Sequence, residues 1–437
     1  MEVWALVMFA VLMALLMMGY PVAFTLGAVA TLFGAVGLGW QFFDLLPLRI
    51  WGVMTNFTLL AVPLFVFMGV VLEKSGLAEE LLETMGRLFG GLRGGLAMSI
   101  VVVGGLLAAT TGVVGATVVT MGVLALPTLL KNHYQPELAS GTIAASGTLG
   151  QLIPPSIILI LLGDVMGVPV GRLFAAAVMP GVLLIGLFIL FVAVYSRLRP
   201  ALAPPVAGPA GAGAARVLKS LLPPLALMVA VLGSIFFGIA SPTESAAVGA
   251  LGAMLLAAGH RRLTLANLTA AMRATTRLTS MVFLILIGAT AFGLVFRGLG
   301  GDRLVHEIMT GLPGGAWGFL VASMLVVFLL GFFLDFLEIC FIVVPILTPI
   351  AVHLGIDPLW FAVLIAVNLQ ASFLTPPFGF SLFYLKAAAP PGIHIQHIYR
   401  GVVPFIAIQV LVLGILLAFP RVTLWLPDLM DRLQGFG

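Results

Sequence analysis

Two stretches of the sequence each place a Pro-Pro pair inside otherwise apolar sequence. They are Ser146–Ser156 and Asn368–Gly379, and their pairs lie 222 residues apart (376 − 154). The same offset matches two further prolines upstream in each copy, Pro127 and Pro136 with Pro349 and Pro358. Because chance seldom aligns four prolines at one spacing, we interpret the stretches as copies in an internal repeat that together build one site.

Proline explains why such a stretch is informative. It lacks a backbone N–H and disfavours helix at the residue before it, so each pair is expected to end one helix and start another. Inside a bilayer, unpaired N–H and C=O groups are tolerated only where they line a cavity or pack within protein. One copy alone could simply start a helix at the membrane surface. Two matched copies favour a transporter site, where freed backbone groups hold a cation or an anion.

The composition fits a membrane protein. Of 437 residues, 62% are hydrophobic and 8% charged, and the mean hydropathy is +1.23, which leaves no sizeable aqueous domain and no nucleic-acid-binding surface. The single cysteine, Cys340, excludes an internal disulfide. No P-loop, Ser-His-Asp triad or metal-ligand spacing occurs, so we expect no cofactor and transport driven by an ion gradient. The expected fold is an all-α polytopic membrane protein of roughly a dozen spans, with two repeats that each contain a re-entrant Pro-Pro hairpin.

Two basic segments without acidic residues, Arg197–Lys219 and Arg261–Arg277, flank a pair of apolar runs. Positive charge favours the cytoplasmic side of a membrane, so both segments are expected there. If each Pro-Pro stretch is a re-entrant hairpin, six apolar crossings separate the two stretches and place both on the same side. One misjudged segment reverses this result, so the sequence leaves the orientation of the repeats open.

Asp335 and Glu338 are the acidic residues of most interest. They lie three residues apart in the long apolar run Ala316–Val352, so on a helix they would share a face. An ionisable residue at membrane depth is a candidate for function. The alternative is that both lie, solvated, at the end of a span. The offset of 222 places them opposite Val113 and Ala116, inside a break of the first long apolar run.

Simpler interpretations apply to other polar positions. Glu244 follows Ser241-Pro242-Thr243 and is expected to stabilise the start of a helix. Asn56 is expected to cap a helix, and Asp164 to lie in a loop. The segment Asp302–Glu307 is interpreted as a polar turn, and Glu73–Arg93 as a solvated amphipathic connector.

The chain resembles the large membrane subunit of TRAP transporters, the tripartite ATP-independent periplasmic family. The resembling segments follow one another over nearly the whole chain: Ser146–Ser156, Ser241–Ala247, Phe333–Ile346, Leu374–Gly379 and Ile398–Phe405. One departure is Ser245, where the family more usually has Ala. The resemblance implies sodium-driven uptake of an organic acid by an elevator-type motion, inverted repeats and a multi-pass location in the bacterial inner membrane. It also implies two partners, a small four-span membrane subunit and a periplasmic substrate-binding protein.

The expected division has four parts: N-terminal scaffold spans and connectors in residues 1–93, a first transport repeat in 94–196, basic linkers and scaffold spans in 197–296, and a second transport repeat with the last span in 297–437. Two alternatives stay open. One is a stand-alone sodium–carboxylate symporter of the wider superfamily. The other is a membrane-embedded enzyme or channel, although only Asp335 and Glu338 approach a catalytic pair and a channel needs no matched breaks.

The candidate substrate- and ion-binding residues lie at the two Pro-Pro stretches and in the acidic segment: Ser146, Gly147, Thr148, Gly150, Pro154, Pro155, Asp335, Asn368, Ser372, Thr375, Pro376 and Pro377. Sodium is a hard cation that suits neutral oxygen ligands, and a broken helix leaves carbonyl oxygens without N–H partners. Ser146, Thr148 and Thr375 are therefore the expected sodium-binding side chains. Gly147 and Gly150 are expected to permit the backbone bend.

Overall fold

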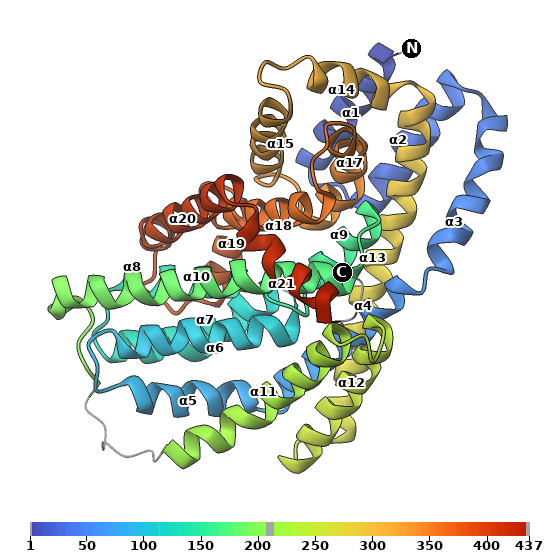
Figure 1. The fold of residues 1–437 in the computed structure, drawn as a ribbon. Helices are drawn as coiled ribbons and strands as arrows, with labels where there is room; N and C mark the ends of the chain where they lie inside the picture. The colour runs from blue at the N-terminus through green and yellow to red at the C-terminus, as the bar shows by residue number, and fades with distance from the viewer. Residues whose placement is uncertain (1, 113, 207–213, 434–437) are drawn as a thin grey trace.

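The computed structural model describes residues 2–112, 114–206 and 214–433, and these residues form helices and connecting loops without any strand (Figure 1). The helices of the first half are α1 (Glu2–Met17), α2 (Val22–Gly37), α3 (Leu46–Met54), α4 (Ala61–Lys74), α5 (Leu77–Phe89), α6 (Gly95–Thr111), α7 (Val114–Lys131), α8 (Pro136–Thr148), α9 (Ile157–Met166) and α10 (Val170–Leu198). Those of the second half are α11 (Ala214–Phe236), α12 (Pro242–Gly259), α13 (Leu265–Gly298), α14 (Gly301–Thr310), α15 (Ala316–Leu330), α16 (Phe336–Glu338), α17 (Val344–His353), α18 (Pro358–Leu374), α19 (Phe380–Ala388), α20 (Ile395–Ala418) and α21 (Arg421–Leu433). A π-helical turn, Ile339–Val343, joins α16 to α17.

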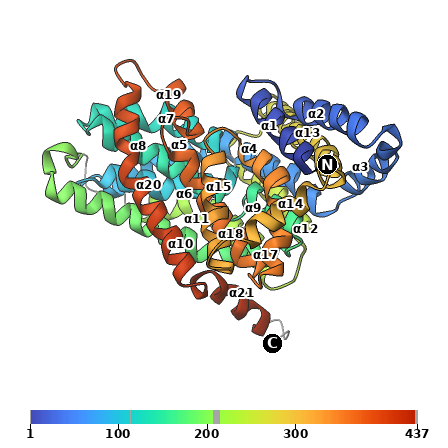
Figure 2. The same ribbon diagram turned by 90° about the horizontal axis from the view of Figure 1, so that it is seen from above.

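The internal repeat extends over the whole chain. Shifting α7 by 222 residues gives 336–353, the span from the start of α16 to the end of α17. In the same way α6 matches α15, α8 matches α18, α2 matches α12, and α4 matches the second half of α13. The packing repeats as well, because α2 lies against α13 while α12 lies against α4. Figure 2 shows α2 beside α13. Each half therefore packs its second helix against the other half.

The first Pro-Pro stretch interrupts one long crossing. Helix α10 follows directly after α9, and its far end returns to the start of α8, where the Tyr195 hydroxyl donates to Gln135 Oε1 at 2.7 Å. The pair α8–α9 therefore extends along the full length of α10, which is about 44 Å at 1.5 Å per residue. In the second repeat, Trp360 near the start of α18 donates from Nε1 to Leu416 O at the end of α20, at 2.9 Å.

The helices that fold back as a pair are α6 and α7, which pack against each other on either side of Gly112 (Figure 1). Since α6 and α7 are joined through a two-residue break and are in contact, they run antiparallel. Each repeat thus has five crossings besides its hairpin, namely α1, α2, α3–α4, α8–α9 and α10 in the first. An odd number makes the second repeat enter from the opposite side.

The expected fold class is confirmed, with a refinement of where the chain turns back. In each repeat the Pro-Pro stretch packs against the turn of the hairpin and itself continues across the membrane. The count that placed both stretches on one side is therefore wrong, because each stretch is itself part of a crossing. The repeats are inverted, as the family resemblance implied.

Few of the described helices are long enough to cross a bilayer on their own. Among the described residues, five are long and apolar enough, listed by range: Val114–Lys131, Val170–Leu198, Leu265–Gly298, Phe336–His353 and Ile395–Ala418. The pair Trp40–Met54 and Thr58–Lys74, bent by 54°, is a further candidate. The remaining apolar helices have 10–17 residues and reach across only as bent or interrupted pairs, or where the bilayer is locally thinned.

Two amphipathic helices lie outside these crossings. The expected connector in Glu73–Arg93 is confirmed as α5, whose Leu77, Leu81 and Met85 are buried. The interpretation of Asp302–Glu307 as a polar turn is wrong, because these residues form most of α14. Its apolar residues recur at helical spacing, at 304, 305, 308 and 309, and this pattern stabilises a helix that covers the protein with one face.

Candidate functional site

Each hairpin turn packs against the break of its own repeat. A Cβ on Gly112 would lie 3.3 Å from the Ile157 side chain, which begins α9 directly after the first Pro-Pro pair. In the second repeat, a Cβ on Gly331 would lie 2.2 Å from Ser372 Oγ. The close approach requires glycine at Gly331, whereas at Gly112 the positive φ of 61° favours it. The two Pro-Pro peptide bonds, Pro154–Pro155 and Pro376–Pro377, are both cis.

The two breaks meet at the centre of the molecule. Gln370 Nε2 donates to Thr148 Oγ1 at 3.3 Å, and these two residues are equivalent in the repeat (370 − 148 = 222). Contact between equivalent residues means that the pseudo-twofold axis passes beside them. Gln409 of α20 donates to the same oxygen at 3.2 Å. All three side chains are fully buried.

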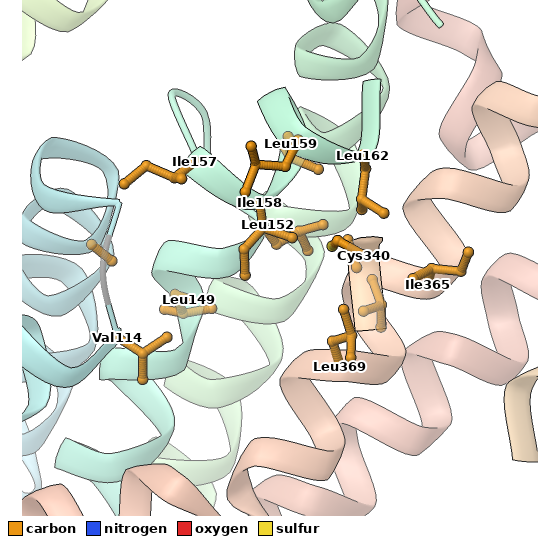
Figure 3. Close-up of a cluster of buried hydrophobic side chains, with 14 of the residues drawn as sticks. Val114, Leu149, Leu152, Ile157, Ile158, Leu159, Leu162, Cys340, Ile365 and Leu369 are labelled. Atoms are coloured by element: carbon orange, nitrogen blue, oxygen red, sulfur yellow. The ribbon is translucent and has the colours of Figure 1, made fainter. Parts of the chain in front are cut away.

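Apolar side chains from both repeats enclose the first break (Figure 3). Leu149 and Leu152 come from the break itself, while Cys340 and Leu369 come from the second repeat. These four residues are completely buried, and Pro154 and Pro155 are buried as well. Dry packing of this kind strengthens any electrostatic interaction made by the freed backbone groups. The Cys340 thiol is buried here, as expected of an inert core residue.

The second break is more open than the first. Pro377 and Phe378 are exposed, whereas their counterparts Pro155 and Ser156 are buried. The Tyr399 hydroxyl donates to Pro377 O at 2.8 Å, and the Phe378 ring packs against Phe333 with centroids 5.4 Å apart. The two Pro-Pro stretches therefore have the same kind of helix break but differ in how exposed the break is.

The candidate hydroxyls each donate to a carbonyl of their own helix. Ser146 Oγ donates to Thr142 O at 2.6 Å, Thr375 Oγ1 to Ala371 O at 2.7 Å, and Ser372 Oγ to Leu369 O at 2.9 Å. A hydroxyl that donates its hydrogen in this way still has its oxygen lone pairs available for a cation. Thr148 differs, because its oxygen also accepts the two amide groups of Gln370 and Gln409.

The remaining candidates at the breaks have packing roles in the structure. Asn368 Nδ2 donates to Met324 O at 2.6 Å and so ties α18 to α15. A Cβ on Gly147 would lie 2.2 Å from Val118 Cγ2, and one on Gly150 would lie 3.1 Å from Ala108 O. Neither glycine has a positive φ. The expected reason for these glycines is therefore corrected: they allow close packing and not an unusual backbone bend.

Asp335 and Glu338 form the turn between α15 and α17. Asp335 Oδ1 accepts the N–H of Phe336 at 2.7 Å, and a Glu338 carboxylate oxygen accepts the N–H of Asp335, which completes a capping box. Glu338 is 5% exposed. The interpretation as a solvated span end is wrong, because the turn lies inside the hairpin. Within the described part of the chain, no Lys or Arg pairs with either carboxylate.

Three further polar residues behave differently from one another. Glu244 forms a capping box with Ser241, as expected. Asp164 lies in the last turn of α9, so its interpretation as a loop residue is wrong. Asn56 Oδ1 accepts the N–H of Thr58 at 2.9 Å, which is a capping contact, and Asn56 Nδ2 donates to Asp164 Oδ1 at 2.5 Å. The segment after α3 is thereby tied to α9.

A set of buried glutamines was not among the residues predicted from the sequence. Gln151 lies in the first break with both amide atoms unpaired, and the Oε1 atoms of Gln370 and Gln409 also lack a partner. The available signal was an amide inside an otherwise apolar helix, since such groups are costly to bury without a role. Over the described residues, no group of three or more His, Cys, Asp or Glu side chains could hold a metal ion.

The fold and its paired breaks define a secondary membrane transporter. Residues 9–422 match the profile of the family described as the tripartite ATP-independent periplasmic transporter, DctM component, and the chain belongs to that family. It is 31% identical to the C4-dicarboxylate TRAP transporter large permease protein of Pseudomonas aeruginosa, over 88% of this chain and 89% of that protein. It is 30% identical to the sialic acid TRAP transporter large permease protein of Vibrio cholerae, over 97% and 98% of the two chains.

One solved structure supports the fold. The YdaH transporter of Alcanivorax borkumensis, described as having an unusual topology, matches with a TM-score of 0.67 and 16% identity over 94% of this chain and 99% of that one. At this identity the likeness shows the architecture alone. The chain is thus a large permease subunit of a TRAP transporter, in agreement with the family resemblance of its sequence.

Proposed function

We propose that this chain is the membrane subunit through which sodium drives the uptake of an organic acid, in the inner membrane of a bacterium. The observation that carries the proposal is the meeting of two repeat-related helix breaks at Thr148 and Gln370. Broken helices at membrane depth supply carbonyls for a cation and N–H groups for a carboxylate. Relatives named for C4-dicarboxylate and sialic acid support an organic acid as the cargo.

Two partners belong to the proposal, a periplasmic substrate-binding protein and a small four-span membrane subunit. The isethionate TRAP transporter permease protein DctMQ of Oleidesulfovibrio alaskensis is 30% identical over 96% of this chain, which covers only 66% of that longer protein. The name DctMQ on a longer chain indicates that a second component is fused to the DctM part in that protein, and this supports a second membrane component here. No catalytic activity is proposed for this chain.

We propose an elevator motion with the division expected from the sequence. Residues 1–93 and 197–296 form the scaffold, and residues 94–196 and 297–437 form the moving part. The hydrogen bond from Asn56 to Asp164 joins these two parts, so it must break when the moving part slides. The close packing of each hairpin turn against its own break supports movement of the two as a unit.

The sodium sites are assigned to the breaks. Ser146 and Thr375 each offer a hydroxyl oxygen that donates its hydrogen bond to a carbonyl and accepts none in the described structure. Freed carbonyls beside them complete a neutral oxygen set, which suits a hard cation. Thr148 contributes if its two amide partners turn away. Asp335 and Glu338 add negative charge at the second hairpin turn.

Thr375→Val tests the sodium assignment. It keeps the shape of the side chain but removes the hydroxyl, so the sodium concentration for half-maximal uptake is expected to rise about tenfold or more, which corresponds to a loss of about 1.4 kcal/mol. The measurement is initial uptake into proteoliposomes at increasing sodium. Thr310→Val is a matched control, because Thr310 Oγ1 also donates to the carbonyl four residues earlier, at 2.7 Å. The assignment fails if both variants keep the sodium dependence of the parent.

A further inference from the structure

A large cavity lies apart from the two breaks. Its volume is about 670 Å³, and it lies between α3, the end of α9, α13, α14 and α17. Cavities of this size commonly hold small organic ligands. The first two of these elements come from opposite sides of the proposed division, so the cavity separates the scaffold from the moving part.

The cavity leads toward the second hairpin turn. One wall is a face of α17 and of the π-helical turn before it, from Pro349 to Phe341. Phe341 lies only three residues after Glu338. Arg297, at the other wall, lies at the end of α13, whose first turns belong to the basic segment Arg261–Arg277. Since α13 is about 51 Å long, the cavity opens on the side opposite the basic loops, which is the periplasmic side.

Three arginines and two aspartates line the cavity, and two of the arginines have no ion-pair partner among the described residues. Arg303 is paired with Glu2, the Asp164 carboxylate accepts from Asn56, and Asp302 accepts the N–H of Arg303 at 3.1 Å. Two guanidinium groups remain. Arg297 Nε donates only to Gly293 O, at 3.2 Å, and among the described residues neither Arg297 nor Arg49 has a carboxylate in ion-pair contact.

We propose that this cavity is a receiving site for small organic anions, held by Arg49 and Arg297 before they reach the breaks. Guanidinium groups match carboxylate and sulfonate oxygens in geometry and charge. A guanidinium group without a carboxylate partner, placed between low-dielectric walls, attracts an anion more strongly than it would in open water. The inference rests on the proposed function, since it supplies the route by which an organic acid delivered from the periplasm enters.

Charged thiol reagents test the cavity without knowledge of the cargo. Cys340→Ala removes the single native thiol, and Gly293→Cys introduces one where a Cβ would meet only Arg297, at 3.8 Å. The full chain in nanodiscs is labelled with the anionic sulfonatoethyl and the cationic trimethylammonioethyl methanethiosulfonates. Each rate is divided by the rate with free 2-mercaptoethanol. Gly52→Cys, with no atom within 4 Å of its Cβ, is a second reporter if the first fails to fold.

The anionic reagent is expected to react about tenfold or more faster than the cationic one after this normalisation. Adding Arg49→Gln and Arg297→Gln should bring the ratio down to about one or below, because it removes the attracting charges and leaves the two aspartates. Arg421→Gln, an exposed arginine outside the cavity, should leave it unchanged. Millimolar succinate should slow anionic labelling in the parent and not in the double arginine variant. The proposal would be overturned by a ratio of one or less in the parent, or by a ratio that is the same in the parent and in the double arginine variant.

An anionic lipid headgroup offers the same chemistry from another source. Labelling in nanodiscs of phosphatidylcholine is therefore compared with labelling in nanodiscs of phosphatidylglycerol. If phosphatidylglycerol blocks the reporter and the arginine variants restore labelling, with no effect of succinate in either lipid, the cavity is a lipid site and the receiving-site proposal is wrong. Because labelling needs neither sodium nor partners, this result stays separate from any failure of sodium-driven uptake.

Discussion

Asp335→Asn is expected to lower the initial rate of uptake at least about tenfold while the chain stays folded. Asn accepts the Phe336 N–H as well as Asp does at the start of a helix, so the substitution removes the charge and keeps the cap. A carboxylate without a basic partner inside a hairpin turn is expected to act on a cation or on the cargo. Uptake into proteoliposomes at matched protein content measures the effect, and thermal unfolding confirms the fold.

Glu338→Gln is the paired variant. Gln keeps an oxygen for the N–H of Asp335, so it also preserves the capping box. We expect a smaller loss, because Glu338 lies in a helical turn whereas Asp335 occupies the break itself. If both variants take up cargo at nearly the parental rate, neither carboxylate takes part in transport and the capping box is their whole role.

Gly141→Val is expected to destabilise the chain by about 3 kcal/mol or more and to abolish uptake. A Cβ on Gly141 would lie 2.1 Å from the backbone oxygen of Gly401, so α8 and α20 must separate. Helices pack this closely in membranes only through small residues. Since α8 carries Thr148 and α20 carries Gln409, their separation also breaks the contact between them. The measurement is thermal unfolding in detergent together with uptake.

Gly186→Ala is the control for this packing. Gly186 also lies inside a helix, α10, but no atom lies within 4 Å of an added Cβ. Ala is the better helix former, so this variant should be as stable as the parent or slightly more stable. Equal stability of Gly141→Val and the parent would mean that the two helices are not held at this distance.

The repeat was predictable from the sequence, whereas its orientation was not. Prolines cannot be shifted along a helix without changing where it breaks, so Pro154 and Pro376 mark equivalent points without any structure. Whether a short helix before such a break turns back or continues depends on what lies beside it. The contact between Tyr195 and Gln135 decides this point, and it joins residues 60 positions apart.

The site was predictable in part for the same reason. Polar residues next to a Pro-Pro pair stand out in apolar sequence, and the structure brings Thr148 and its repeat equivalent Gln370 into contact. Gln409 has Leu187 as its repeat equivalent, so no internal comparison marks it. Arg49 and Arg297 are brought to one cavity from helices far apart in the chain. Isolated arginines near span ends carry no signal of that kind.

The most direct test of the account is uptake by purified components. Proteoliposomes with this chain, the small membrane subunit, the binding protein loaded with its organic acid and an inward sodium gradient are compared with proteoliposomes that lack one component at a time. We predict accumulation only when all four are present. Accumulation by this chain alone under a sodium gradient would instead show a stand-alone symporter, and accumulation without sodium would contradict the proposed coupling.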